Sequence, residues 1–146
     1  MVLALAESRD TILGDCSQVS PTLLNGVPYF FEKVMRFLID QGVGDTPGAA
    51  LQLLGGRIRM CCSGGAALPD HVAKFYQQQK LYLVQGYGLT ETSPVITVSD
   101  RPEKIGTVGR PLEGVEVRIA DDGEIVARGP PVIEGYGGRG DGTAGR

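Results

Sequence analysis

Residues 57–91, RIRMCCSGGAALPDHVAKFYQQQKLYLVQGYGLTE, contain the pattern that decides the fold. Apolar and polar residues alternate over 57–62, which predicts a strand. A glycine-rich turn over 63–68 follows, and Pro69-Asp70 then suits the start of a helix. The positions that this helix should turn inward are Val72, Phe75 and Tyr76.

A second apolar run over 81–84 predicts another strand, which ends in the turn Gln85-Gly86-Tyr87-Gly88. Upstream, residues 22–27 predict a strand, and a helix should run from Pro28 to the glycines near residue 42. The apolar positions of that helix are Phe30, Phe31, Val34, Met35, Phe37 and Leu38. Strand, helix, strand, helix and strand in this order predict an α/β fold with a largely parallel sheet flanked by helices.

The pattern changes after residue 100. Residues 115–119 alternate strictly, residues 121–123 form a turn signal, and residues 124–128 continue as a second short strand. This is typical of a hairpin, so we expect a small antiparallel β subdomain over roughly 105–135. The expected division is a partial α/β subdomain (1–100), a β subdomain (101–136) and a flexible glycine- and arginine-rich tail (137–146).

Composition narrows the class of protein. The 146 residues are 42% hydrophobic and 21% charged, with a net charge of −3 and no basic stripe, which argues against a nucleic-acid partner. The apolar stretch Met1–Ala6 is too short for a membrane span or a signal peptide. With three cysteines and one histidine, the sequence predicts no zinc site and no disulfide framework, and therefore the reducing cytoplasm. Cys61 and Cys62 are expected to be small buried strand residues.

The turn after the last predicted strand combines groups that suit a nucleotide. The ring of Tyr87 offers a flat face for adenine, and Gly86 and Gly88 would let a nucleotide approach the backbone. The hydroxyl of Thr90 can donate to a phosphate oxygen, and the carboxylate of Glu91 is a ligand that suits Mg²⁺. The glycine pair Gly64-Gly65 in the earlier turn is weaker evidence for a ligand site by itself, because glycine pairs often form ordinary turns.

Four stretches follow one another in order: Ser63–Leu68 (S-G-G-A-x-L), Gln85–Glu91 (containing Y-G-x-T-E), Gly106–Pro111 (G-x-x-G-x-P), and Gly123–Gly129 with Gly135-Tyr136 (G-E-[IL]-x-x-x-G…G-Y). Together they resemble the motifs of the adenylate-forming synthetases, which include acyl-CoA synthetases, firefly luciferase and peptide-synthetase adenylation domains. Ala6-Glu7-Ser8 and residues 21–34 are most similar to segments of long-chain fatty acyl-CoA synthetases.

The resemblance implies a reaction and its cofactors. ATP and a fatty acid would give acyl-AMP and pyrophosphate, and coenzyme A would then form the thioester. It also implies site residues in this sequence. Thr90 and Glu91 would be catalytic, with Thr90 at the α-phosphate and Glu91 as the Mg²⁺ ligand. The nucleotide would be held by Gly64, Gly65, Ala66, Gln85, Gly86, Tyr87, Gly88 and Thr90. Gly65 would lie beside the adenine or the acyl carboxylate. Tyr29 and Phe30 would line the acyl side, or alternatively belong to the core.

The chain also departs from the family pattern. It lacks the P-K-G phosphate loop, the T-G-D aspartate and the catalytic lysine, so we expect an internal piece of a synthetase that is inactive alone. A non-catalytic remnant that still binds a nucleotide or an acyl group is the alternative, as is a synthetase for another carboxylic acid. A remnant should be stable and monodisperse, whereas a piece cut through its sheet should aggregate. Peripheral contact with a membrane stays open.

Overall fold

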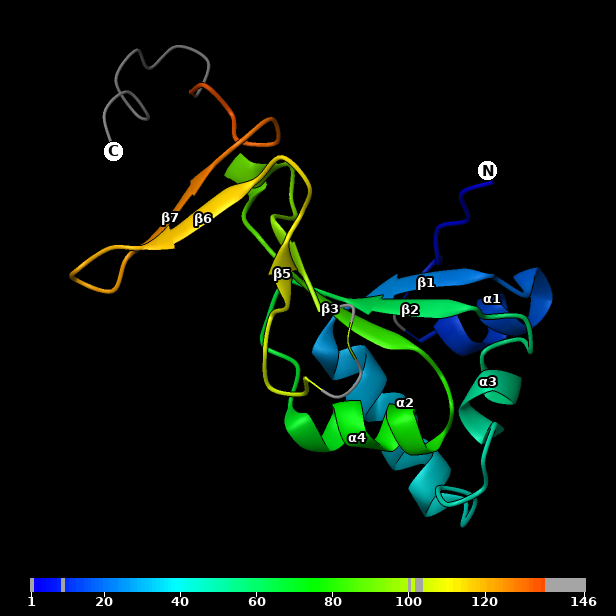
Figure 1. Ribbon diagram of the computed structural model, residues 1–146. Coiled ribbons are helices and arrows are strands. Elements are labelled where there is room, and N and C mark those ends of the chain that lie inside the picture. The colour runs from blue at the N-terminus through cyan, green and yellow to red at the C-terminus, as the bar shows by residue number, and fades with distance from the viewer. Residues whose placement is uncertain (1, 9, 100, 102–103, 136–146) are drawn as a thin grey trace.

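The computed structural model describes residues 2–8, 10–99, 101 and 104–135 (Figure 1). The helices are α1 (Ile12–Val19), α2 (Pro28–Asp40), α3 (Ala49–Leu53) and α4 (Asp70–Gln78), with a 3₁₀ turn η1 (Thr90–Thr92). The strands are β1 (Leu23–Gly26), β2 (Met60–Ser63), β3 (Leu83–Tyr87), β4 (Thr97–Val98), β5 (Arg110–Pro111), β6 (Glu116–Ile119) and β7 (Ile125–Arg128). None of the helices in these described ranges is long and apolar enough to cross a membrane.

The larger sheet has the strand order β1-β2-β3-β4-β5. β1, β2 and β3 are parallel neighbours, which confirms the largely parallel sheet predicted from the strand–helix alternation. β4 and β5 then add two short antiparallel strands to β3, a feature that the sequence did not predict. β5 comes from beyond residue 101 and is nevertheless part of this sheet.

Helices α2 and α4 cover one face of the sheet (Figure 1). Their contact centres on Phe31 and Tyr76, which are both fully buried, with ring centroids 5.5 Å apart and the rings perpendicular. The Tyr76 hydroxyl donates to the Phe31 carbonyl over 3.1 Å, so the one polar atom of this ring pair is satisfied. The buried core comprises Cys16, Phe31, Val34, Met35, Leu38, Ala50, Leu54, Ile58, Cys61, Leu68, Val72, Phe75, Tyr76 and Leu81.

Two aromatic residues of α2 lie outside that core. Tyr29 is 66% exposed, so the alternative interpretation of Tyr29 as a core residue is wrong, and Phe37, one of the apolar positions predicted for this helix, is 42% exposed. Helix α2 is covered on one side only, and these two residues lie on its outer side, where they border a surface groove. Phe30 is half-buried and packs against the core cluster.

β3 begins two residues later than the sequence predicted and includes residues that were expected to form a turn. The chain leaves α4 through Lys80, whose φ of +56° is left-handed, and the Leu81 N–H donates to the Tyr76 carbonyl. This closure ends the helix and keeps residues 80 and 81 out of the strand. At the other end, pairing with β4 holds Gly86 and Tyr87 extended.

β6 and β7 form a separate two-stranded antiparallel sheet, which confirms the predicted hairpin. Figure 1 shows it extending away from the five-stranded sheet. The segment after β7 returns to the main body, where the Ile133 N–H donates to the Glu91 carbonyl over 2.9 Å. The tail predicted over 137–146 lies outside the described residues, as does Tyr136.

Candidate functional site

Three parallel strands end side by side at one edge of the sheet. Gly26, Ser63 and Gln85 are register partners on β1, β2 and β3, and the Gly64 N–H donates to the Gly26 carbonyl over 3.1 Å. In open α/β sheets, ligands bind in the crevice beyond the carboxyl ends of the strands. Both glycine-containing turns predicted from the sequence leave the sheet at this edge.

The two turns approach each other through glycines. A Cβ atom on Gly64 would stand 3.7 Å from the Gly86 carbonyl oxygen, so a methyl group at Gly64 would just reach the backbone of β3. Gly65 has a φ of +78°, which favours glycine, and both it and Ala66 are exposed. The two sequence motifs, whose glycines Gly64 and Gly86 are 22 positions apart, therefore lie next to each other, and both of these glycines are half-buried.

Thr92 holds the turn after β3 in shape. Its hydroxyl accepts a hydrogen bond from the Leu89 N–H over 2.8 Å and donates to the Leu89 carbonyl over 2.9 Å. The Thr92 N–H also donates to that carbonyl, over 3.0 Å. Thr92 is buried and directly follows the motif Gln85–Glu91 in the sequence. It fixes the backbone that presents Thr90 and Glu91.

Gly88 faces its own chain. A Cβ atom there would stand 2.8 Å from Val95 Cα and still closer to the Pro94 carbonyl oxygen, so no side chain fits. Close packing inside the turn accounts for glycine at this position without any ligand. Contact between Gly88 and a nucleotide remains a prediction.

The other predicted side chains lie along the same turn. Tyr87 is half-buried at the end of β3, where its carbonyl accepts a hydrogen bond from the Ile96 N–H over 2.8 Å. Thr90 is exposed and Glu91 is half-buried, both on η1. An aromatic ring, a hydroxyl and a carboxylate therefore follow one another beyond the strand end, with backbone from the β2 turn alongside.

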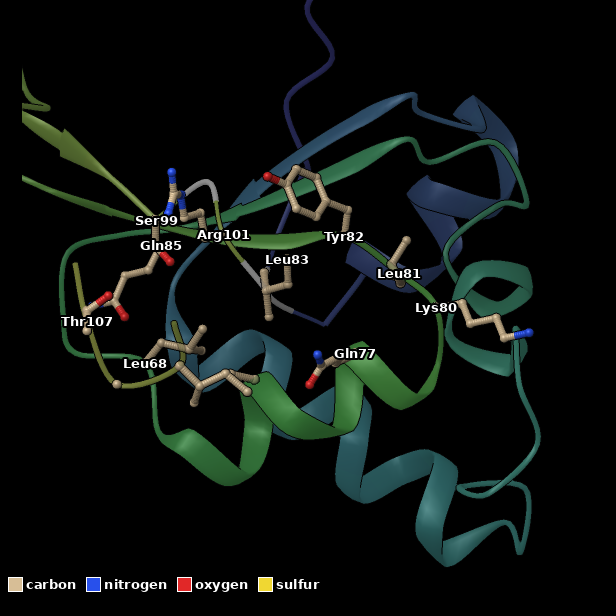
Figure 2. A pocket seen from close by; sticks show the side chains of 13 residues that line it. Leu68, Gln77, Lys80, Leu81, Tyr82, Leu83, Gln85, Ser99, Arg101 and Thr107 are labelled. Atoms are coloured by element: carbon tan, nitrogen blue, oxygen red, sulfur yellow. The ribbon is translucent and has the colours of Figure 1, made fainter. Parts of the chain in front are cut away.

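A pocket of about 210 Å³ lies between α4, β3 and the segment that follows β4 (Figure 2). Of the predicted site residues, Gln85 lines this pocket, at the end where Thr107 also lies. Leu68 and Leu83 point into the space between helix and strand, whereas Lys80 points outward at the far end (Figure 2). Gln85 thus connects the strand-end surface to a pocket that the sequence did not predict.

Ser63 is a second feature that sequence reasoning missed. It is 1% exposed, and its hydroxyl oxygen has no hydrogen-bond partner among the described residues. Buried hydroxyls are rarely left unpaired. The motif S-G-G-A contained this serine, but no pattern in the sequence indicated that its hydroxyl would be buried.

The cysteines are poor candidates for nucleophiles. All three are free thiols, and burial raises the pKa of each. Cys61 is fully buried, and its pKa rises to about 12. Cys62 is half-buried rather than buried as expected. Since the thiolate is the reactive form, these residues act as small apolar side chains at neutral pH.

The raised pKa of Cys61 predicts a loss of stability in alkali. The unfolded thiol ionises near pH 9.0 and the folded one near pH 12, so the folded state retains a proton that the unfolded state has lost. The free energy of unfolding should therefore fall above pH 9.0, by about 1.4 kcal/mol per pH unit for this group. Urea unfolding on both sides of this pH measures the slope. Cys61→Ala should make this slope shallower than Cys62→Ala does, because burial raises the pKa of Cys61 more than that of Cys62; equal slopes in the two variants would contradict the assignment.

The chain matches the model of the family described as "AMP-binding enzyme" over residues 1–137. It is 48% identical over 84 residues to the long-chain-fatty-acid–CoA ligase FadD15 of Mycobacterium bovis, an alignment that covers 57% of this chain and 14% of that protein. It is 33% identical to the feruloyl-CoA synthase of an Amycolatopsis species, over 99% of this chain and 30% of that protein. The chain therefore spans less than a third of the length of these two relatives.

Solved structures share the fold. A benzoate CoA ligase from Burkholderia xenovorans superposes with a TM-score of 0.69 at 23% identity, over 94% of this chain and 29% of that one. The o-succinylbenzoate CoA synthetase MenE of Bacillus subtilis, in complex with ATP and magnesium, gives 0.68 at 23% identity, over 90% and 28%. The match over residues 1–137, together with this shared fold, shows that the chain belongs to the AMP-binding enzyme family.

Proposed function

We propose that this chain carries part of the nucleotide site of an AMP-forming acyl-CoA ligase. The single observation that supports this most is that the motifs around Gly64 and Gly86 lie side by side at the ends of β2 and β3, where a Cβ atom on Gly64 would stand 3.7 Å from the Gly86 carbonyl oxygen. The turn after β2 exposes Gly65 and Ala66, while Tyr87 ends β3, and Thr90 and Glu91 follow on η1. That combination suits a nucleotide, which needs a flat contact for its base and donors for its phosphates.

The proposed roles follow from the side chains. Tyr87 and Gly86 frame the adenine, with Gly64, Gly65, Ala66 and Gln85 completing the surface around it. Thr90 donates its hydroxyl to the α-phosphate. Glu91 suits Mg²⁺ by donor chemistry, because this ion prefers carboxylate oxygens and shares its remaining ligands with phosphates. The metal would offset phosphate charge as the acid attacks. The protein's contribution is then to hold the reactants together and to stabilise developing charge.

We propose a long-chain fatty acid as the acid and coenzyme A as the acceptor in the complete enzyme. The 48% identity to the fatty-acid ligase supports this choice. The 33% identity to the feruloyl-CoA synthase extends over 99% of the chain and favours an aromatic acid as the second candidate. Titration of the chain with a fatty acid and with ferulate, each in the presence of AMP, would rank the two.

Two further proposals concern organisation. We place the protein in the cytoplasm, on the basis of its free thiols. We also propose that residues 1–100 act as the nucleotide- and acyl-binding part and residues 101–136 as a β subdomain. The isolated chain is expected to bind substrates without turning them over, because the P-K-G loop and the catalytic lysine implied by the resemblance are not in its sequence.

Glu91→Gln tests the metal role. The substitution keeps the size of the side chain and removes its charge, so the gain in ATP affinity that Mg²⁺ provides should fall by about tenfold, equivalent to ~1.4 kcal/mol. Calorimetric titration of ATP with and without Mg²⁺ measures this gain. Glu113→Gln, which neutralises an exposed carboxylate elsewhere, is the matched control. An unchanged Mg²⁺ dependence in Glu91→Gln would contradict the role, and absence of ATP binding by the unaltered chain would contradict the proposed function.

A further inference from the structure

The Glu91 carbonyl lacks the donor that the geometry of its own turn would otherwise supply. In a 3₁₀ helix the carbonyl of one residue accepts from the N–H three residues later, as the Thr90 carbonyl accepts from the Ser93 N–H over 3.3 Å. The residue three positions after Glu91 is Pro94, which has no N–H. Glu91 is half-buried, and a buried carbonyl without a donor is costly, so the donor has to come from another part of the chain.

The segment that leaves β7 supplies this donor. It first makes a turn, in which the Val132 N–H donates to the Gly129 carbonyl over 3.1 Å. The next N–H along the chain, that of Ile133, donates to the Glu91 carbonyl over 2.9 Å. Figure 1 shows this segment, in orange, coming back beside the green turn that contains η1. A backbone group from within the fourth sequence motif therefore takes the place of the N–H that Pro94 lacks.

The base of the β6–β7 hairpin holds this segment in place. A Cβ atom on Gly129 would stand 2.7 Å from the Gly114 carbonyl oxygen and 3.1 Å from Val115 Cα, so no side chain fits between the backbone that enters the hairpin and the backbone that leaves it. Val115 is buried, and its N–H donates to the Leu112 carbonyl over 3.0 Å. The two ends of the hairpin are therefore packed closely against each other.

Both of these ends are also bonded to the turn that contains η1. The Ile96 N–H closes that turn by donating to the Tyr87 carbonyl over 2.8 Å, and the Ile96 carbonyl accepts from the Leu112 N–H over 2.9 Å. Leu112 precedes the hairpin, and Ile133, which bonds to Glu91, follows it. The hairpin is thus fixed to the turn at two points, one of which is the residue proposed to hold the metal.

We infer that the segment over residues 129–133 positions Glu91 for Mg²⁺. The Ile133 N–H fixes the Glu91 carbonyl, and Thr92 fixes the backbone of Leu89 at the start of the same short turn. The backbone around Glu91 is therefore held on both sides, and its carboxylate is presented from a fixed Cα. Ile133 is a positioning residue that acts through Glu91 by its backbone. The inference rests on the proposed function, since it assumes that Glu91 is the metal ligand.

Exchange of the Ile133 amide for an ester tests this role, because the ester oxygen removes the donor and leaves the isoleucine side chain in place. The gain in ATP affinity that Mg²⁺ provides should fall by about threefold to tenfold, which corresponds to the net contribution of one hydrogen bond. The affinity for AMP without Mg²⁺ should stay within about twofold of that of the unaltered chain. Calorimetric titration measures both affinities.

The same exchange at Ala120 is the matched control. The Ala120 N–H donates to the Glu124 carbonyl over 2.8 Å at the other end of the hairpin, so this variant also loses one backbone hydrogen bond but should keep the full Mg²⁺ gain. Combining the Ile133 ester with Glu91→Gln separates positioning from general damage to the fold. On the Glu91→Gln background the ester should lower the Mg²⁺ gain by less than about twofold, because both changes act through one carboxylate.

An Mg²⁺ gain that the Ile133 ester retains would overturn the inference and leave the proposed function intact. An equal loss in the Ala120 ester would also overturn it, because the effect would then not depend on the bond to Glu91. An unaltered chain without any Mg²⁺ gain would instead refute the metal role of Glu91, and the inference with it. A scalar coupling between the Ile133 nitrogen and the Glu91 carbonyl carbon, measured by NMR without ligand, detects the hydrogen bond itself. We expect this coupling, and its absence would contradict the inference whatever the titrations show.

Discussion

Gly88→Ala is expected to lower the free energy of unfolding by about 3 kcal/mol, at the upper end of the cost of overpacking. The new methyl group would lie against the Pro94 carbonyl oxygen, with Val95 Cα 2.8 Å away. Backbone atoms on both sides leave no flexible side chain that could move aside. The turn that presents Thr90 and Glu91 would have to open, so nucleotide affinity should fall together with stability. Urea unfolding and calorimetric titration measure the two effects.

Gly64→Ala is the matched control in the facing turn. Its methyl group would stand 3.7 Å from the Gly86 carbonyl oxygen, an ordinary contact distance, so the stability should change by less than about 1 kcal/mol. If Gly88→Ala also changed the free energy of unfolding by less than about 1 kcal/mol, the close packing of Gly88 against Pro94 would be refuted.

Phe31→Ala is expected to be the most damaging core substitution, with a loss of about 3–5 kcal/mol. Phe31 is fully buried and contacts the rings of both Phe30 and Tyr76 edge-on. Its removal would leave a cavity between α2 and α4 beneath the strands. Small domains have a total unfolding free energy of about 5–15 kcal/mol, so the variant should be largely destabilised. Thermal and urea unfolding measure the loss.

Phe37→Ala on the same helix provides the comparison. Phe37 is 42% exposed, and its truncation should cost less than about 1 kcal/mol. Similar losses in the two variants would mean that α2 does not bury the face described above.

Periodicity predicted the elements that have a clear inside and outside. β1, α2, β2, α4 and the β6–β7 hairpin were all predicted, because the apolar residues of each recur with the period of a strand or a helix. The short helices α1 and α3 and the two-residue strands β4 and β5 were missed. β4 is a strand because it pairs with β3, and β5 is one because it pairs with β4. Each has only two residues, which are too few to form a sequence pattern that predicts such pairing.

The sequence predicted which motifs form the candidate site, but not how their residues are arranged in space. The sequence supplied Gly64, Tyr87, Thr90 and Glu91, and the strand register then placed their turns at the same sheet edge. The close packing of Gly88 was not predictable, because its neighbours at Pro94 and Val95 approach only after the chain has turned through η1. Tyr29 shows a different limit of sequence-based prediction, because an aromatic residue in a helix with an apolar pattern can still lie on the exposed side of that helix.

The most direct test of the central claim is the amide NMR spectrum of the chain, recorded while AMP is added. If the nucleotide site is where we propose it, the largest shifts should occur at Gly64, Gly65 and Ala66, and at residues 85–90. Amides of the β6–β7 hairpin should not move. Shifts confined to other parts of the chain, or no shifts up to saturating AMP, would contradict a nucleotide site at the ends of β2 and β3.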